Sequence, residues 1–121
     1  MDKIKSFTDL NVWKEGHKFV LLVYKLTENF PTGEKFGLVN QLRRAAVSVT
    51  SNISEGFSRG SRKEKIQFYR MALGSLAESQ NQLIISKDLG YLSEGAFKQV
   101  FEQSTVVTKL LLGTIKSARS F

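Results

Sequence analysis

Apolar residues recur at intervals of three and four along most of the chain, and no stretch alternates as a strand would. This pattern predicts four helices, over about 9–28, 33–57, 61–88 and 94–119. The connections between them are short, and short connections make neighbouring helices antiparallel. We therefore expect an all-α fold in which residues 1–121 form a single up-down-up-down four-helix bundle.

Breakers and capping residues mark the boundaries of these helices. Pro31 cannot continue a helix and is expected to end the first. Gly90 is expected to end the third in the left-handed conformation. Side chains that can accept hydrogen bonds from first-turn amides precede each helix. These expected caps are Thr8 or Asp9, Thr32, Ser61 with Glu64, and Ser93.

Two of the predicted helices carry the apolar seam of a left-handed bundle, with residues alternately three and four apart. The seam of the second helix consists of Val39, Leu42, Ala46, Val49 and Ile53. The seam of the fourth helix consists of Phe97, Val100, Ser104, Val107, Leu111, Thr114 and Ala118. These residues are the expected core.

The first helix is apolar on two nearly opposite faces. One face consists of Trp13, His17, Val20 and Tyr24. The other consists of Val12, Phe19, Leu22 and Leu26. A helix that is apolar on two sides is buried on two sides, either in an unusually large core or against another subunit. Four helices form no second layer, so the second face predicts a homo-oligomer with Val12, Phe19, Leu22 and Leu26 in its interface.

A polar stripe lies opposite the apolar seam of the second helix. Short Ser and Asn side chains occupy it, where a solvated face would carry Lys and Glu. Small polar residues allow close helix approach with hydrogen bonds between neighbours, although an ordinary solvated face is the alternative. Antiparallel pairing would set Arg44 near Ser75, and Arg44 or Arg43 is expected to form an ion pair with Glu78. The whole stripe comprises Gln41, Arg43, Arg44, Ser48, Asn52, Glu55 and Glu78.

Three stretches, "QLRRAAVSV", "NISEG" and "ALGSLAE", together with "FTDLNVW" and "LGYL", resemble the four-helix-bundle family that is also called the S23 or 23S rRNA intervening-sequence protein family. The resemblance covers nearly the whole chain, and "NISEG" stands where the family usually has "NIAEG". The signature positions are Arg43, Arg44, Asn52, Glu55, Gly56 and Glu78.

The resemblance implies a cytoplasmic bacterial protein that assembles as a homopentamer and has no enzymatic activity. A related branch of the family consists of accessory proteins of diversity-generating retroelements, which bind a reverse transcriptase and nucleic acid. The resemblance implies no catalytic role for any of the signature residues.

The charge balance points to a polyanionic partner. Eighteen Lys and Arg against eleven Asp and Glu give a formal charge of +7, and such an excess favours phosphate contacts. In the expected bundle, the termini and the "SRGSRK" turn share one end, where eight cations face four acids. The cations are Lys3, Lys5, Arg59, Arg62, Lys63, Lys65, Lys116 and Arg119. The acids are Asp2, Asp9, Glu55 and Glu64.

The opposite end has no such excess, because three lysines face four acids there. Its charged residues are Lys25, Lys35, Lys87, Glu28, Glu34, Asp88 and Glu94. We therefore expect RNA or DNA to bind at the basic end through its backbone, since aromatic residues do not interleave with the cations. The expected contacts are Arg59, Arg62, Lys63, Lys65, Lys116 and Arg119. The alternative is an oligomeric scaffold that docks a reverse transcriptase or a ribosomal component.

Catalytic and cofactor motifs are missing from the sequence. A di-iron bundle needs paired Glu-x-x-His motifs, and His17 is the single histidine. There is no cysteine, and "GFSRGSRK" lacks the spacing of a phosphate-binding loop. We expect neither a metal nor a cofactor, and no enzymatic activity. The N-terminus lacks the apolar run of a signal peptide, and "FVLLVY" is too short to span a bilayer, so we expect a cytoplasmic protein without membrane contact.

Overall fold

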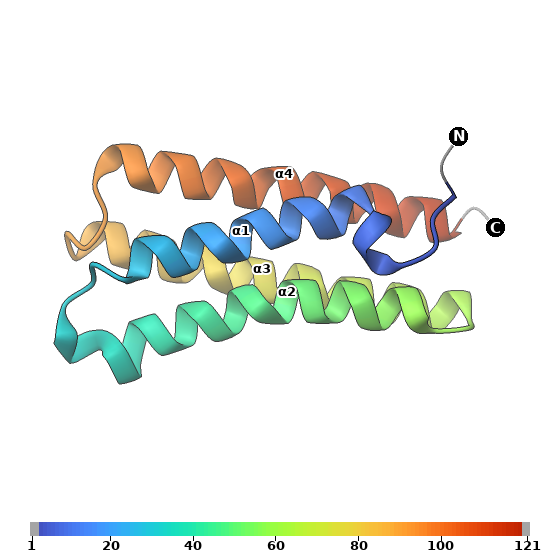
Figure 1. The fold of residues 1–121 in the computed structure, drawn as a ribbon, viewed down its shortest axis with the longest axis horizontal. Coiled ribbons are helices and arrows are strands. Elements are labelled where there is room, and N and C mark those ends of the chain that lie inside the picture. The colour runs from blue at the N-terminus through green and yellow to red at the C-terminus, as the bar shows by residue number, and fades with distance from the viewer. Residues whose placement is uncertain (1–2, 120–121) are drawn as a thin grey trace.

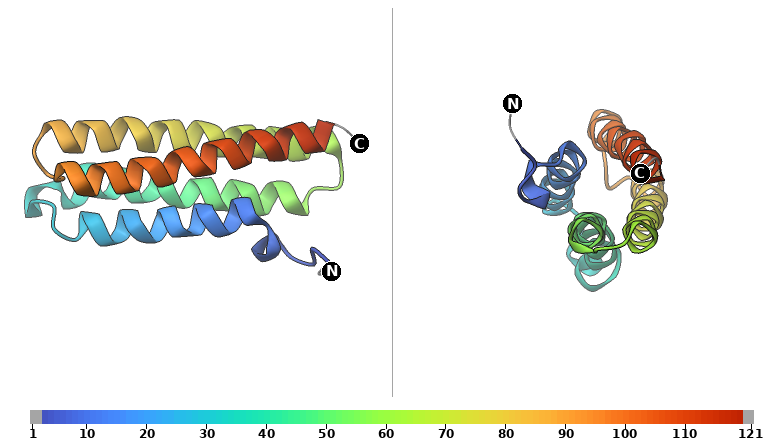
Figure 2. Two further views of the ribbon diagram at one scale, coloured as in Figure 1. Left: turned by 90° about the horizontal axis from the view of Figure 1, so that it is seen from above. Right: turned by 90° about the vertical axis from the view of Figure 1, so that its right-hand side faces the viewer.

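The computed structural model describes residues 3–119, and their regular secondary structure is helical throughout. Four long helices lie side by side, and their connections alternate between the two ends (Figure 1). They are α1 (Asn11–Thr27), α2 (Asn40–Ser58), α3 (Arg62–Asp88) and α4 (Glu94–Arg119). Figure 2 shows them end-on, arranged around one common core. The predicted all-α class is confirmed.

The boundaries of α3 and α4 are set by the residues that the sequence indicates. The Ser61 hydroxyl accepts a hydrogen bond from the backbone N–H of Glu64 at 3.1 Å, and the Ser93 hydroxyl accepts one from Ala96 at 3.1 Å. Gly90 has a φ of 83°, which is the left-handed conformation of a helix C-terminus. These three expectations are confirmed.

The start of α1 differs from the prediction. A short 3-10 helix, Phe7–Asp9, comes first, and Ser6 caps it. The Asp9 carboxylate accepts hydrogen bonds from the backbone N–H groups of Lys5 (2.9 Å) and Ser6 (3.1 Å). These contacts hold the pKa of Asp9 below its usual value. Because Asp9 is committed to this turn, neither it nor Thr8 caps α1, which begins at Asn11 without a side-chain cap.

The segment before α2 also departs from the predicted single helix. Thr32–Glu34 forms a 3-10 turn in which Thr32 caps nothing, and Lys35–Val39 forms a π-helical turn. Gly37 interrupts this turn with a φ of −110° and a ψ of −109°. Regular α-helix therefore begins at Asn40.

The core follows the predicted seams with one shift. The seam predicted for the second helix is buried at all five positions, of which Val39 lies in the π-helical turn and the other four lie in α2. On α4, Val100, Ser104, Val107 and Leu111 are buried, but the next buried residue is Ile115, while Thr114 is half-buried. A straight helix has 3.6 residues per turn, so a strict seventh-residue repeat drifts off the core face over several turns.

The predicted oligomer interface on α1 is wrong, because that face points into the core of the single chain. Phe19 is completely buried, and Val12 is 4% exposed. Leu22 and Leu26 are half-buried against the same core. The alternative of a large core accounts for this face. The exposed large apolar residues of α1 are Leu21, at 55%, and Tyr24, at 40%.

The helices α2 and α3 approach each other closely at Gly56. A Cβ atom at this position would lie 2.7 Å from the Tyr69 ring and 3.2 Å from Cβ of Phe68. No side chain fits there without displacing the ring, so Gly56 allows the buried Tyr69 to pack against the backbone of α2.

Candidate nucleic-acid interface

The charged residues of the predicted basic end do gather at one end of the bundle. The described parts of both termini lie beside the turn between α2 and α3 (Figure 1). The first residues of α3 and the last residues of α4 therefore come from distant parts of the sequence and reach the same end. Asp2, one of the four acids assigned to this end, lies outside the described residues.

Arg59, a predicted nucleic-acid contact, instead forms ion pairs with carboxylates on both sides of the turn between α2 and α3. Its Nη2 lies 3.1 Å from Oε2 of Glu55, and its Nη1 lies 3.9 Å from Oε2 of Glu64. Its guanidinium also packs 4.6 Å from the centre of the Phe68 ring. Two carboxylates therefore already neutralise this cation, and we remove Arg59 from the set of phosphate contacts.

Lys65 is also a structural residue. Its ammonium group donates hydrogen bonds to the carbonyl oxygens of Phe57 (2.7 Å) and Gly56 (3.3 Å), which are in the last turn of α2. A lysine in this position satisfies acceptors that have no partner within the helix and complements the helix dipole. Lys65 is thus removed from the set as well.

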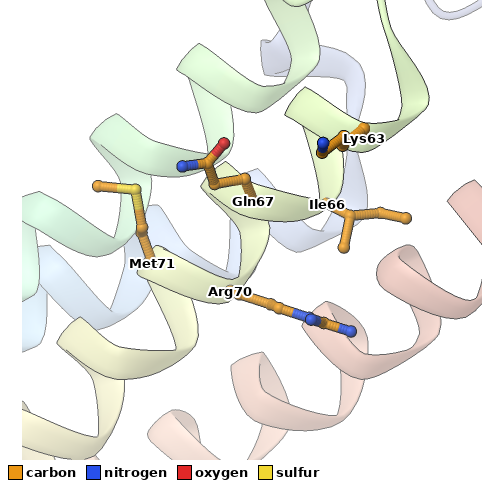
Figure 3. Close-up of a pocket in the computed structure, with 5 residues that line it drawn as sticks. All are labelled: Lys63, Ile66, Gln67, Arg70 and Met71. Carbon is orange, nitrogen blue, oxygen red and sulfur yellow. The ribbon is translucent and has the colours of Figure 1, made fainter.

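Arg62 and Lys63 remain, and the structure adds Arg70 to them. All three are exposed and make no side-chain hydrogen bond or ion pair within residues 3–119. Lys63 and Arg70 are seven residues apart and share one face of α3. They line a shallow groove of about 650 Å³ with Ile66, Gln67 and Met71, and Arg70 reaches toward α4 (Figure 3).

The C-terminal half of α4 extends the positive charge beside this groove. From Gln103 to the end of the helix the sequence has three cations, Lys109, Lys116 and Arg119, and no acid. All three side chains are exposed. We define the basic face as the exposed cations of the first turns of α3 and the last turns of α4. Its members are Arg62, Lys63, Arg70, Lys109, Lys116 and Arg119.

The basic face consists of cations and includes no side chain that commonly binds a metal ion. Within residues 3–119, no group of three or more His, Cys, Asp or Glu side chains could hold a metal ion. The imidazole of His17 stacks on the Trp13 ring, with 4.8 Å between the two ring centres. No helix in the described part of the chain combines the length and the apolar character that crossing a membrane requires.

The centre of the polar stripe lies at the contact between α2 and α3. The hydroxyl oxygens of Ser48 and Ser75 are 2.8 Å apart and share a hydrogen bond. The Asn52 amide donates to the carbonyl oxygen of Ser48 at 2.9 Å. Ser48, rather than Arg44, is therefore opposite Ser75, so the predicted register was wrong by one helical turn.

The two arginines of the stripe point in different directions. Arg43 faces α1, where its Nε donates to the Thr27 hydroxyl at 2.9 Å and its Nη2 donates to the carbonyl oxygen of Tyr24 at 3.2 Å. Arg44 lines a groove with Glu78, but no ion pair joins them among the described residues. The prediction of an ion pair to Glu78 is therefore wrong for both arginines. Of the other stripe residues, Gln41 is exposed and Glu55 pairs with Arg59.

Comparison with known proteins identifies a family and a similar fold. The sequence model of the 23S rRNA-intervening sequence protein family matches residues 8–113. A similar solved structure, at 1.70 Å resolution, is that of a protein of unknown function from the S23 ribosomal protein family of Bacteroides thetaiotaomicron VPI-5482. It superposes with a TM-score of 0.81 and 24% identity, over 87% of this chain and 95% of that one. A comparison with curated proteins gave no match.

Proposed function

The chain belongs to the 23S rRNA-intervening sequence protein family, and from this premise we propose that it is a non-enzymatic nucleic-acid-binding accessory protein. In this proposal the antiparallel bundle assembles as a cytoplasmic homo-oligomer, with five subunits as the family resemblance implies. It binds the RNA or DNA backbone through the basic face.

The observation that carries this proposal is the segregation of charge on the folded chain. Glu64 is the single acid among residues 62–77 of α3, and it lies beside Arg59 rather than beside the groove of Lys63 and Arg70. Cations without neighbouring acids attract phosphates and release counterions when they bind them. Repetition of this face around an oligomer would let one strand engage several subunits.

The proposal is tested by the salt dependence of binding. Fluorescence anisotropy of a labelled uridine decamer and of its DNA counterpart, from about 50 to 200 mM salt, measures how many phosphates the protein neutralises. We expect a variant with Arg62, Lys63, Arg70 and Arg119 replaced by Gln to bind more weakly. The logarithm of the binding constant falls linearly with the logarithm of the salt concentration. For the variant, the magnitude of this slope should be smaller by about 0.7 for each phosphate of a single strand that it no longer neutralises.

A matched variant controls for net charge. Replacement of Lys25, Lys35, Lys87 and Lys98 by Gln removes the same charge from outside the basic face, and it should leave the slope nearly unchanged. Equal losses of affinity in the two variants would show that only total charge matters. Absence of binding even at 50 mM salt would contradict the proposed function.

The subunits of the proposed homo-oligomer contact each other through the outer side of α1, not through its buried face. Leu21 (55% exposed) and Tyr24 (40%) are neighbours on the outer side of α1, and Tyr24 shares a groove with Val47 (39%) of α2. Light scattering should give several times the 13.6 kDa of one chain. Leu21→Lys with Val47→Lys should lower this mass, whereas Leu112→Lys, at a 54% exposed position of α4, should not.

A protein partner is the second candidate, because the groove of the basic face has apolar side chains as well as cations. Ile66 and Met71 line this groove together with Lys63 and Arg70 (Figure 3). A reverse transcriptase or ribosomal component with an acidic, partly apolar segment would match this lining. Loss of such a complex upon Met71→Asp, in a protein that shows no RNA binding, would favour this candidate.

A further inference from the structure

A second groove lies at the other end of the bundle and is lined mostly by polar side chains. It has a volume of about 630 Å³ and lies where α2 begins, beside α3. Its size falls within the range of about 300–1,000 Å³ that is usual for small-ligand sites. Phe36, Asn40, Gln41, Arg44 and Glu78 contribute to its lining. No step of the backbone binding proposed above uses these residues.

The aromatic ring at this groove is exposed, and the backbone turn that carries it is fixed by two hydrogen bonds. Phe36 is 86% exposed, and the π-helical turn that carries it is fixed by Glu34. One carboxylate oxygen of Glu34 accepts a hydrogen bond from the N–H of Leu38 at 3.2 Å, and the other accepts one from the Tyr91 hydroxyl at 2.9 Å. The Lys35 ammonium lies 5.5 Å from the centre of this ring, and the fixed turn lowers the backbone ordering cost of stacking a base on it.

The groove also presents one cation and one anion that do not neutralise each other. Arg44 forms no ion pair within the described residues. The Glu78 carboxylate is oriented by Gln82, whose Nε2 donates to Oε2 of Glu78 at 3.1 Å. The other polar atom of the buried Gln82 amide, Oε1, has no hydrogen-bond partner, so the bond to Glu78 is the one that fixes this amide. Gln82 thus acts as a positioning residue for Glu78.

Guanine is the nucleobase that matches this combination. Its Watson–Crick edge presents two adjacent donors, N1–H and the 2-amino group, which the two oxygens of one carboxylate can accept. Its O6 and N7 are acceptors that an arginine fork can contact, and its face can stack on Phe36. Adenine and cytosine would set a ring nitrogen lone pair against the carboxylate.

We propose that the groove lined by Phe36, Arg44 and Glu78 binds an unpaired guanine base of a single-stranded nucleic acid. Phe36 stacks on the base, Glu78 accepts from N1–H and the 2-amino group, and Arg44 donates to the O6 edge. This inference rests on the proposed function and deepens it, because it adds base readout to backbone binding. The groove of Lys63 and Arg70 lies on the first half of α3, whereas Glu78 lies on its second half beside the start of α2, so variants can separate the two sites.

The experiment compares labelled uridine decamers that differ in one central nucleotide. At 150 mM salt, a central guanosine should tighten binding by about tenfold over uridine, as a good bidentate contact does. Inosine, which lacks the 2-amino group, should lose most of this gain. Glu78→Gln should abolish the preference, and Phe36→Ala should weaken binding of the guanosine decamer by about tenfold.

Two control variants test whether the loss of guanine preference is specific to the groove, and a free nucleotide tests the groove without backbone binding. Glu102→Gln and Leu112→Ala change an exposed acid and an exposed apolar residue elsewhere and should preserve the preference. Equal affinity for the guanosine, inosine and uridine decamers would overturn the proposal while leaving backbone binding intact. A fall in oligomer mass upon Phe36→Ala, without a change in preference, would also overturn it and assign Phe36 to a subunit contact. If no decamer binds, equilibrium dialysis of guanosine monophosphate against the other monophosphates tests the groove alone, and equal uptake would refute it.

Discussion

Replacement of Arg43 by Ala removes the contact that fastens the start of α2 to the last turn of α1. A half-buried, charge-assisted hydrogen bond such as that to Thr27, at 2.9 Å, contributes about 1.5 kcal/mol. The exposed bond to the Tyr24 carbonyl contributes little. The guanidinium lies 4.5 Å from the centre of the Tyr24 ring, which at an exposed site adds about 0.5 kcal/mol. We therefore expect Arg43→Ala to lower the free energy of unfolding by about 2 kcal/mol.

The adjacent arginine provides the matched control. Arg44 is exposed and lacks such partners in the described part of the chain, so Arg44→Ala should change stability by less than about 0.5 kcal/mol. Urea unfolding followed by circular dichroism measures both values, at one fixed protein concentration because assembly would make stability concentration-dependent. A double-mutant cycle of Arg43→Ala with Thr27→Val should show coupling of about 1 kcal/mol. Equal losses of stability for the two arginines, or additive effects in the cycle, would refute the assigned role of Arg43.

Three further changes test the packing and its pH dependence. Gly56→Ala should lower stability by more than about 1 kcal/mol in urea titrations, since its Cβ would meet the Tyr69 ring at 2.7 Å. Phe19→Lys should unfold the chain, with loss of the helical circular dichroism signal, because it buries an unpaired charge in the core. The hydrogen bond to Glu34 raises the pKa of Tyr91 above its usual value of about 10. The stabilisation that accompanies this shift is therefore present below about pH 10 and disappears as the pH rises through the raised pKa, and Tyr91→Phe should flatten that part of the stability curve.

Local signals made most of the fold predictable from the sequence. Ser61, Gly90 and Ser93 act on the backbone within a few residues of themselves, so their roles could be assigned without tertiary information. The seam of α2 was equally clear, because one face of that helix is apolar and the opposite face is not. The seam of α4 could be predicted as far as Leu111. Beyond it, the difference between about 3.5 and 3.6 residues per turn has accumulated, so Ile115 is buried in place of Thr114.

The direction in which α1 faces could not be derived from its own sequence. The periodicity shows that α1 is apolar on several sides, but the neighbours of the helix decide which side is the core. The register of α2 on α3 depends on the geometry of the turn around Arg59, where one helical turn of difference placed Ser48 opposite Ser75.

The candidate site was predictable in its location but less so in its members. Net charge and topology sufficed to indicate the basic end. The structural roles of Arg59 and Lys65 depend on carboxylates and carbonyl oxygens brought close by folding. Arg70 was missed because it lies two turns along α3, away from the "SRGSRK" turn, yet on the same face as Lys63. The exposure of Phe36 depends on the π-helical turn, which no recognised sequence pattern indicates.

Lysine footprinting tests the central claim, that nucleic acid contacts the basic face, most directly. Brief acetylation of the protein with and without a saturating uridine decamer, followed by mass spectrometry, measures the accessibility of each lysine. We expect the decamer to protect Lys63 and Lys109, which lie on the basic face, and to leave Lys25 and Lys98 unchanged. Uniform protection of all four lysines, or protection of Lys25 and Lys98 alone, would contradict the account.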